Sequence, residues 1–75
     1  VKRVGDVVRI AQHLAVVRAP DADHVDIGTP VVDENLDDLG RVVDVFGPVE
    51  RPYLAVTTDD DVHLPGLVGS ALYAR

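Results

Sequence analysis

The stretch from Leu39 to Thr57 reads L-G-R-V-V-D-V-F-G-P-V-E-R-P-Y-L-A-V-T, and it predicts the fold more strongly than any other part of the chain. Two apolar runs, Arg41 to Phe46 and Tyr53 to Val56, flank a connector that holds one glycine and two prolines. Valine, phenylalanine and tyrosine prefer the pleated, half-buried surface of a sheet. We therefore predict two β-strands that end at the connector, because proline has no N–H to give to a strand ladder.

The connector itself is compatible with two interpretations. A plain proline-rich hairpin loop is one of them. However, the stretch also holds the only Phe of the chain and one of its two Tyr residues. Rigid prolines beside these rings would form an apolar surface that is ordered before a partner arrives, which lowers the entropy cost of binding. On strict alternation, Val43 and Val45 share one strand face while Val42 and Phe46 share the other, and the sequence does not decide which face fills the core.

The length and composition indicate one small domain over residues 1–75. A chain of 75 residues removes only about 60% of its unfolded surface from water, so it usually needs an additional source of stability. Cysteine is absent, which excludes a disulfide and a thiolate metal site, and a partner becomes the leading candidate. No apolar run approaches the ~20 residues of a membrane helix, and no signal-peptide pattern opens the sequence. We therefore expect a cytoplasmic protein without a membrane partner.

The charge balance argues against direct contact with nucleic acid. Thirteen acidic residues stand against seven Lys and Arg residues, for a net charge of −6. Proteins that bind RNA or DNA directly neutralise phosphates with clustered Lys and Arg. An abundance of Asp with a single Lys is typical of halophilic proteins, because ions screen the self-repulsion of a large net charge. An ordinary acidic domain is the other interpretation.

Four further segments have strand character: Val4–Ile10, Leu14–Arg18, Pro30–Val32 and Leu67–Ala74. The first two could instead form one helix, because apolar residues between positions 7 and 17 also fall at helical spacing. Six short strands separated by turn signals predict an all-β fold, a small six-stranded β-barrel.

The segments between these strands are polar. Ala19–Pro30 and Thr58–Gly66 are expected to be irregular loops, and Asp33–Asp38 a turn with Asn35 in the left-handed conformation. Gly40 is expected to mark a bulge or a close approach of two backbones.

Catalytic chemistry finds little support in the sequence. Ser70 is the only serine, and it lies between small residues in a predicted strand. Two groups of possible metal ligands occur in loops: Asp59, Asp60, Asp61 and His63, and Asp23, His24 and Asp26. Neither group has a recognised ligand spacing, so solvated acidic loops explain both, although a metal-dependent hydrolase would result if the first group converged on one ion. No glycine-rich phosphate loop occurs. We therefore expect a binding module with no catalytic residue, cofactor, metal or small-molecule substrate.

The segment G-R-V-V-D-V-F-G-P-V-E-R-P-Y-L-A-V resembles the signature of the Gar subunit of H/ACA ribonucleoproteins, which carry out RNA-guided pseudouridylation. The likeness extends to V-G-D-V near the start, V-V-D-E-N-L-D-D-L-G before the signature and V-G-S-A-L-Y near the end. Two features depart from the family. The first hairpin lacks a glycine-containing turn, and the arginine–glycine tails of eukaryotic relatives are missing. The resemblance is therefore to an archaeal form, and the RNA-binding role of those tails is not carried over.

The resemblance implies a non-catalytic six-stranded barrel that docks on a TruB-like pseudouridine synthase. Such a subunit helps substrate RNA to load and product RNA to leave during rRNA pseudouridylation, and it meets guide RNA only indirectly, through the complex. Carried onto this chain, the family's interface falls on Phe46, Gly47, Pro48, Val49, Pro52 and Tyr53. Arg41 and Arg51 could pair with acidic groups of the synthase. A PRC-barrel-like ribosome-maturation module that binds a ribosomal protein is the alternative, since it shares V-V-D…L-G-R-V-V-D, but that family has no reason to carry F-G-P-V-E-R-P-Y.

Overall fold

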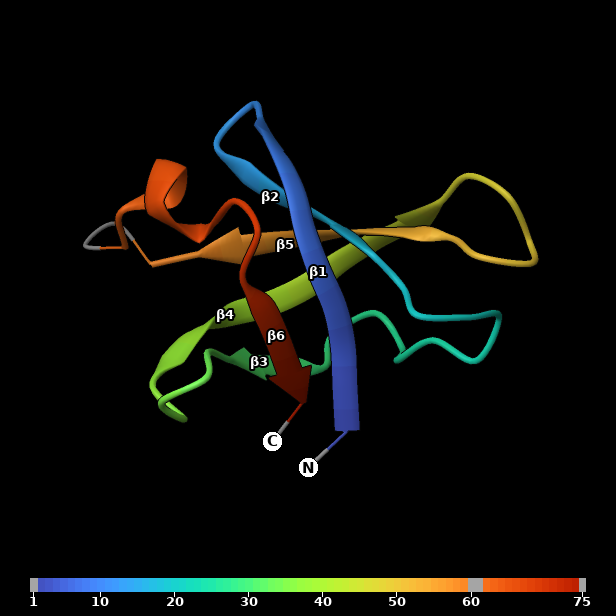
Figure 1. The fold of residues 1–75 in the computed structure, drawn as a ribbon, viewed down its shortest axis with the longest axis horizontal. Coiled ribbons are helices and arrows are strands. Elements are labelled where there is room, and N and C mark those ends of the chain that lie inside the picture. Colours follow the sequence, from blue (N-terminus) through green and yellow to red (C-terminus); the bar gives the residue numbers. More distant parts are fainter. Residues whose placement is uncertain (1, 60–61, 75) are drawn as a thin grey trace.

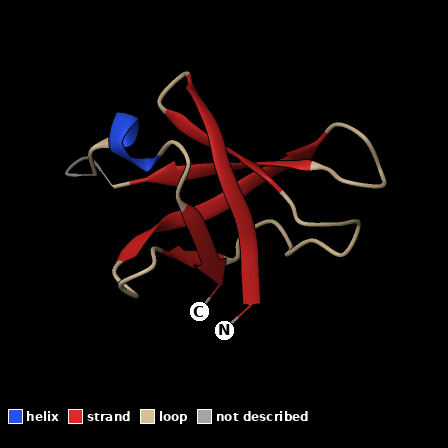
Figure 2. Cartoon of the chain, viewed as in Figure 1, coloured by secondary structure: helices blue, strands red, loops and turns tan. Residues whose placement is uncertain are grey.

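The computed structural model describes residues 2–59 and 62–74 and shows a barrel of antiparallel strands (Figure 1). Its elements are β1 (Lys2–Ala11), β2 (Leu14–Arg18), β3 (Pro30–Val32), β4 (Asp38–Phe46), β5 (Tyr53–Thr58), the 3-10 helix η1 (Leu64–Leu67) and β6 (Ala71–Ala74). The strands close in the order β1-β2-β5-β4-β3-β6. The predicted all-β, six-stranded barrel is confirmed, and Figure 2 shows that η1 is the single helical turn in the described ranges. None of the helical residues described forms a helix able to cross a membrane.

The first hairpin shows that the helical alternative for residues 7–17 is wrong. β1 and β2 pair antiparallel up to Ala11 opposite Leu14, which leaves Gln12 and His13 as a two-residue turn. Their φ angles are 52° and 63°, as a type I′ turn requires. Asn-Gly is the usual sequence of such a turn, so the local sequence did not reveal this one.

Two β-bulges in β1 explain why the sequence was ambiguous there. The register shifts between Arg3 and Gly5 and again between Val7 and Arg9. Each shift moves the inward-facing position by one residue. As a result Val4 and Val7 are buried and Ile10 packs against the core, a spacing of three residues that resembles one face of a helix.

A third bulge decides the orientation of β4. The register against β5 shifts between Val42 and Asp44, with Val43 as the extra residue. Val42 is fully buried and Val45 also packs against the core, whereas Phe46 stays 38% exposed. The expectation that Val42 and Phe46 share a face is therefore wrong, because the bulge reverses the alternation between them.

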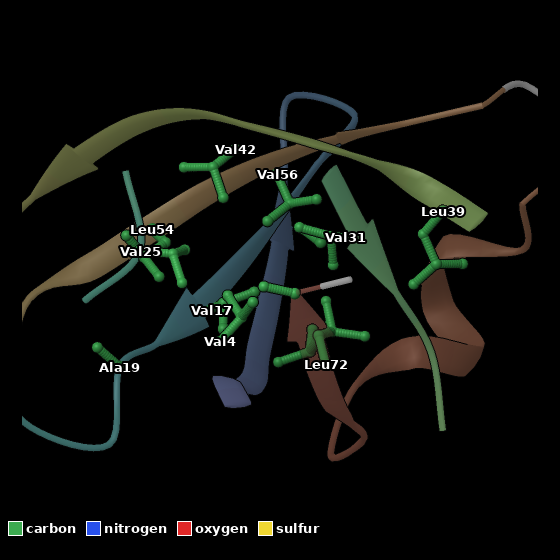
Figure 3. Close-up of a cluster of buried hydrophobic side chains, with 13 residues drawn as sticks. Val4, Val17, Ala19, Val25, Val31, Leu39, Val42, Leu54, Val56 and Leu72 are labelled. Carbon is green, nitrogen blue, oxygen red and sulfur yellow. The ribbon is translucent and has the colours of Figure 1, made fainter. Parts of the chain in front are cut away.

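The core is one cluster made mostly of valine, with contributions from all six strands (Figure 3). Its buried members are Val4, Val7, Ala15, Val17, Ala19, Val25, Val31, Leu39, Val42, Leu54, Val56, Leu72 and Ala74. No polar or charged side chain is buried within residues 2–59 and 62–74. The long loop after β2 is irregular as predicted, but it also contributes Ala19 and Val25 to this core.

Two predicted segments have different details in the structure. In the turn before β4, Leu36 rather than Asn35 has the left-handed φ of 66°, because the Asp33 carboxylate accepts the Asn35 N–H and fixes the first part of the turn. The last strand begins at Ala71 instead of residue 67. Residues 64–66, expected to belong to an irregular loop, form η1 together with Leu67, and Pro65 lies in its first turn, where the missing N–H costs nothing.

Gly40 combines both expected features, since it follows a register shift and touches the neighbouring strand closely. A Cβ on Gly40 would lie 1.7 Å from the carbonyl oxygen of Thr57. We predict that Gly40→Ala lowers the free energy of unfolding by at least about 2 kcal/mol and the melting temperature by roughly 8–16 °C. Gly66→Ala is the control for thermal melting, because its Cβ would meet only the side chain of His63. Equal losses of melting temperature in the two variants would contradict the close contact between Gly40 and the Thr57 backbone.

The Gln12–His13 turn provides a second stability test. A left-handed conformation costs a non-glycine residue about 1–2 kcal/mol, part of which glycine recovers. We predict that His13→Gly raises the free energy of unfolding by about 0.5–1 kcal/mol and the melting temperature by roughly 2–8 °C. His63→Gly is the control, because His63 has a φ of −82° and should lose stability. A loss of stability in His13→Gly would contradict the hairpin.

Candidate functional site

The predicted binding residues lie at one end of the barrel, where β4 and β5 extend beyond the other strands. Residues 47–52, here called the connector loop, lie at the right of Figure 1, on the same side as the first part of the loop after β2. The opposite end carries η1 and the acidic turn before β4. The two loops therefore form a separate surface at the right-hand end.

Two aromatic rings form the centre of this surface. Phe46 and Tyr53 are directly opposite each other on β4 and β5, and their rings stack with centres 5.7 Å apart and planes 21° apart. Such pairs contribute about 0.5–1.5 kcal/mol beyond the burial of their area. The stack leaves Phe46 partly exposed and Tyr53 half-buried. Part of an ordered apolar pair therefore faces solvent.

Arg18 on β2 fixes the position of Tyr53, and the sequence analysis missed it. Its Nη1 donates a hydrogen bond of 2.9 Å to the Tyr53 hydroxyl, and its guanidinium carbon lies 4.9 Å from the centre of the Tyr53 ring. The two residues are paired across β2 and β5. A partner 35 residues away in the chain leaves no local signal, so only the strand pairing reveals this contact.

The connector loop is held by backbone and side-chain contacts. Gly47 adopts a φ of +89°, and the Arg51 N–H donates to the Pro48 carbonyl at 3.3 Å. Two contacts join the connector loop to the residue that follows β2: the Arg51 Nε donates to the Ala19 carbonyl at 2.9 Å, and the Ala19 N–H donates to the Pro52 carbonyl at 3.0 Å. Arg51 thus has a bracing role within the chain.

The structure brings the six predicted binding residues together but exposes them unequally. Gly47, Pro48 and Val49 are exposed, and Val49 keeps 86% of its surface in water. Pro52 is buried, and its carbonyl accepts the Ala19 N–H, so it supports the connector loop and is not itself exposed to a partner. Arg41 lies away from these residues, opposite Thr57 near the other end of β4.

A small hollow of about 250 Å³ separates the connector loop from the loop after β2. Its lining is apolar except for His24, which, together with Ala22, comes from the loop after β2. The His24 Nδ1 donates to the Val25 carbonyl at 2.8 Å, so in the neutral ring Nε2 is left as an acceptor. The sequence analysis treated His24 only as a possible metal ligand and missed this placement.

The possible metal ligands do not converge in the part of the chain that the structure describes. Asp23 forms an ion pair with Lys2 at 3.3 Å, and the ring of His24 bonds to the backbone. Asp60 and Asp61 lie outside the described residues. Within residues 2–59 and 62–74 no three His, Asp or Glu side chains are placed to share an ion. The described geometry therefore gives no support to a metal-dependent hydrolase.

Comparisons with known proteins agree with the fold. Residues 1–75 match the family model described as "Gar1/Naf1 RNA binding region". The solved structure titled "Structure of the Gar1 domain of NAf1" superposes with a TM-score of 0.74, covering 99% of this chain and 85% of that chain at 16% sequence identity. At that identity the likeness shows the fold alone. The chain has no match among curated proteins.

Gly47 allows a direct test of how the aromatic pair is held. A Cβ at this position would lie 2.8 Å from the Tyr53 ring, whereas a Cβ on Gly69 would meet nothing within 4 Å at nearly the same φ of +90°. We predict that Gly47→Ala loses about 1–2 kcal/mol of stability and displaces Tyr53, which NMR would detect as changed ring-current shifts at Phe46. Gly69→Ala should show the loss of stability without those shifts. Unchanged Phe46 shifts in both variants would contradict the packing.

Proposed function

The chain belongs to the Gar1/Naf1 family, and from this premise we propose that it is a non-catalytic accessory subunit of an archaeal H/ACA ribonucleoprotein. In this role it binds the TruB-like pseudouridine synthase and promotes substrate RNA loading and product release in rRNA pseudouridylation. The observation that carries the proposal is the stacked, partly exposed Phe46–Tyr53 pair beside an exposed connector loop. The family match also favours this resemblance over the PRC-barrel-like alternative.

The energetics of the surface support a protein partner. Aromatic residues in desolvated pockets dominate many protein interfaces, and fully burying a side chain such as Val49 contributes about 1.5–3 kcal/mol. The surface is also ordered in the free chain, because Arg18 holds Tyr53 and the hydrogen bond from Arg51 to the Ala19 carbonyl holds the connector loop. Less conformational entropy is therefore lost when the partner binds.

The charges favour indirect contact with RNA. A phosphate-binding surface needs several cations that are free to neutralise phosphates. None of the six predicted binding residues is a cation. The two nearest arginines both contact the chain itself: Arg18 bonds to Tyr53, and Arg51 bonds to Ala19. The RNA named in the family description is then reached through the synthase and the assembled particle. A cytoplasmic location and adaptation to high salt belong to the same proposal.

Association of the purified synthase and this chain at molar salt tests the proposal. We predict a complex by calorimetry whose Kd rises at least about 30-fold when Phe46→Ala and Tyr53→Ala are combined, because such truncations cost about 2 kcal/mol or more at a hot spot. Val68→Ala is the control, since Val68 is 51% exposed and lies outside this surface. Circular dichroism establishes that each variant is folded. The absence of a complex, or a complex that the double variant leaves unchanged, would count against the proposal.

A further inference from the structure

The side chains that four neighbouring strands turn away from the core form a regular grid, here called the outer face. The strand registers of β1, β2, β5 and β4 define its three rows. Across those strands in order, the rows are Ala11, Leu14, Thr57 and Arg41; Arg9, Val16, Ala55 and Asp44; and Asp6, Arg18, Tyr53 and Phe46. The last row contains the aromatic pair, so the outer face is continuous with the candidate site.

A hollow of about 380 Å³ occupies the middle of the outer face. Val16 and Ala55 lie side by side within it, and they are only 4% and 5% exposed although neither belongs to the core cluster. Arg9 lines the hollow from β1 and Phe46 lines it from β4. Ala11 and Leu14 add further apolar lining, and the polar members of the lining are Arg9, Gln12 and Asp44. Such a lining fits an apolar side chain of a partner that has polar groups beside it.

Two of the bulges add apolar surface at the edges of the outer face. Val8 and Val43 are the extra residues of β1 and β4, and they remain 43% and 40% exposed. Seven large apolar residues are exposed in the described part of the chain. Of these, Val8, Val43 and Phe46 lie on the outer face and Val49 lies on the adjoining loop. Apolar surface gathered in this way marks an interaction site.

The outer face carries more cations than carboxylates, although the chain as a whole is acidic. It holds three arginines and two aspartates, whereas the other described residues include three Lys or Arg and nine Asp or Glu. Asp6 forms an ion pair with Arg3. The hydrogen bond to Asp6, and then the charge of its carboxylate, raise the pKa of Arg3. Asp44 accepts the Val45 N–H. The three arginines have no ion-pair partner among residues 2–59 and 62–74.

We propose that the outer face is part of the docking surface for the synthase, occupied by an apolar ridge of that protein flanked by carboxylates. The inference rests on the proposed function and names the chemistry of the partner surface. Arg9 and Arg41 supply charge complementarity, while the acidic remainder of the chain repels an acidic partner from other orientations. Single-stranded RNA is disfavoured as the occupant, because the chain carries a net charge of −6 and the outer face offers few cations to neutralise phosphates.

Two substitutions on the outer face test this inference in complexes with the full synthase. Arg9→Glu reverses a charge at the rim, and Ala55→Arg fills the hollow. We predict that each raises the Kd by at least about tenfold, and that Arg9→Glu also slows association at low salt. Lys2→Glu and Val68→Arg are matched controls outside the grid and should bind within about twofold of the unmodified chain. Thermal melting of every variant excludes unfolding as the cause.

The outcomes separate this inference from the proposed function. If the unmodified chain forms the complex but Arg9→Glu and folded Ala55→Arg bind as the controls do, the outer face lies outside the interface and only this inference fails. If the unmodified chain does not associate with the synthase, both fail together. A third measurement uses a single-stranded RNA oligonucleotide without synthase. Binding of this RNA that Arg9→Glu abolishes would make the outer face an RNA platform and overturn the proposal.

Discussion

The pairing of β4 with β5, from Gly40 opposite Thr58 to Phe46 opposite Tyr53, is the constraint on which the core and the candidate site both depend. At one end of the ladder the missing Cβ of Gly40 lets the backbones meet closely. At the other end the register places two aromatic rings opposite each other, where they stack. Between them the bulge at Val43 reverses the alternation, so Val42 enters the core while Phe46 faces out. A ladder without the bulge would turn Phe46 inward and remove the exposed aromatic surface.

Because of the bulges, some valines of this very small barrel face the core and others face solvent. A domain of this size has a thin core, and its stability is correspondingly marginal. Inward valines build that core, whereas the extra residues Val8 and Val43 remain exposed on the outer face. Closure of the barrel pairs the strand edges that a valine-rich sheet would otherwise expose to aggregation. Four of the seven large apolar side chains that are exposed in the described residues thus lie together, on the outer face and the adjoining connector loop.

The acidic composition and the apolar surface act together in the proposed complex. A large negative charge keeps the chain soluble and discourages unspecific contact with RNA, since both carry the same sign of charge. The arginines of the outer face stand apart from that background, and Arg18 also orders Tyr53. Orientation would then come from charge, and most of the affinity from desolvated apolar side chains. The placement of Val16 and Ala55 beside Phe46 joins both contributions on one surface.

The sequence by itself determined the fold class, the two central strands, the bounds of β2 and β3 and the apolar connector, because each follows from local preferences of valine, proline and glycine. It also determined the acidic character that disfavours RNA. Only the tertiary structure decided which face of each strand fills the barrel, because a bulge depends on the partner strand and reverses every side chain beyond it. The same holds for the Gln12–His13 turn, which lacks the usual turn residues, and for Arg18 and His24. Arg18 contacts Tyr53 across two strands, and His24 lines a hollow together with the connector loop, so no local pattern of residues reveals either placement.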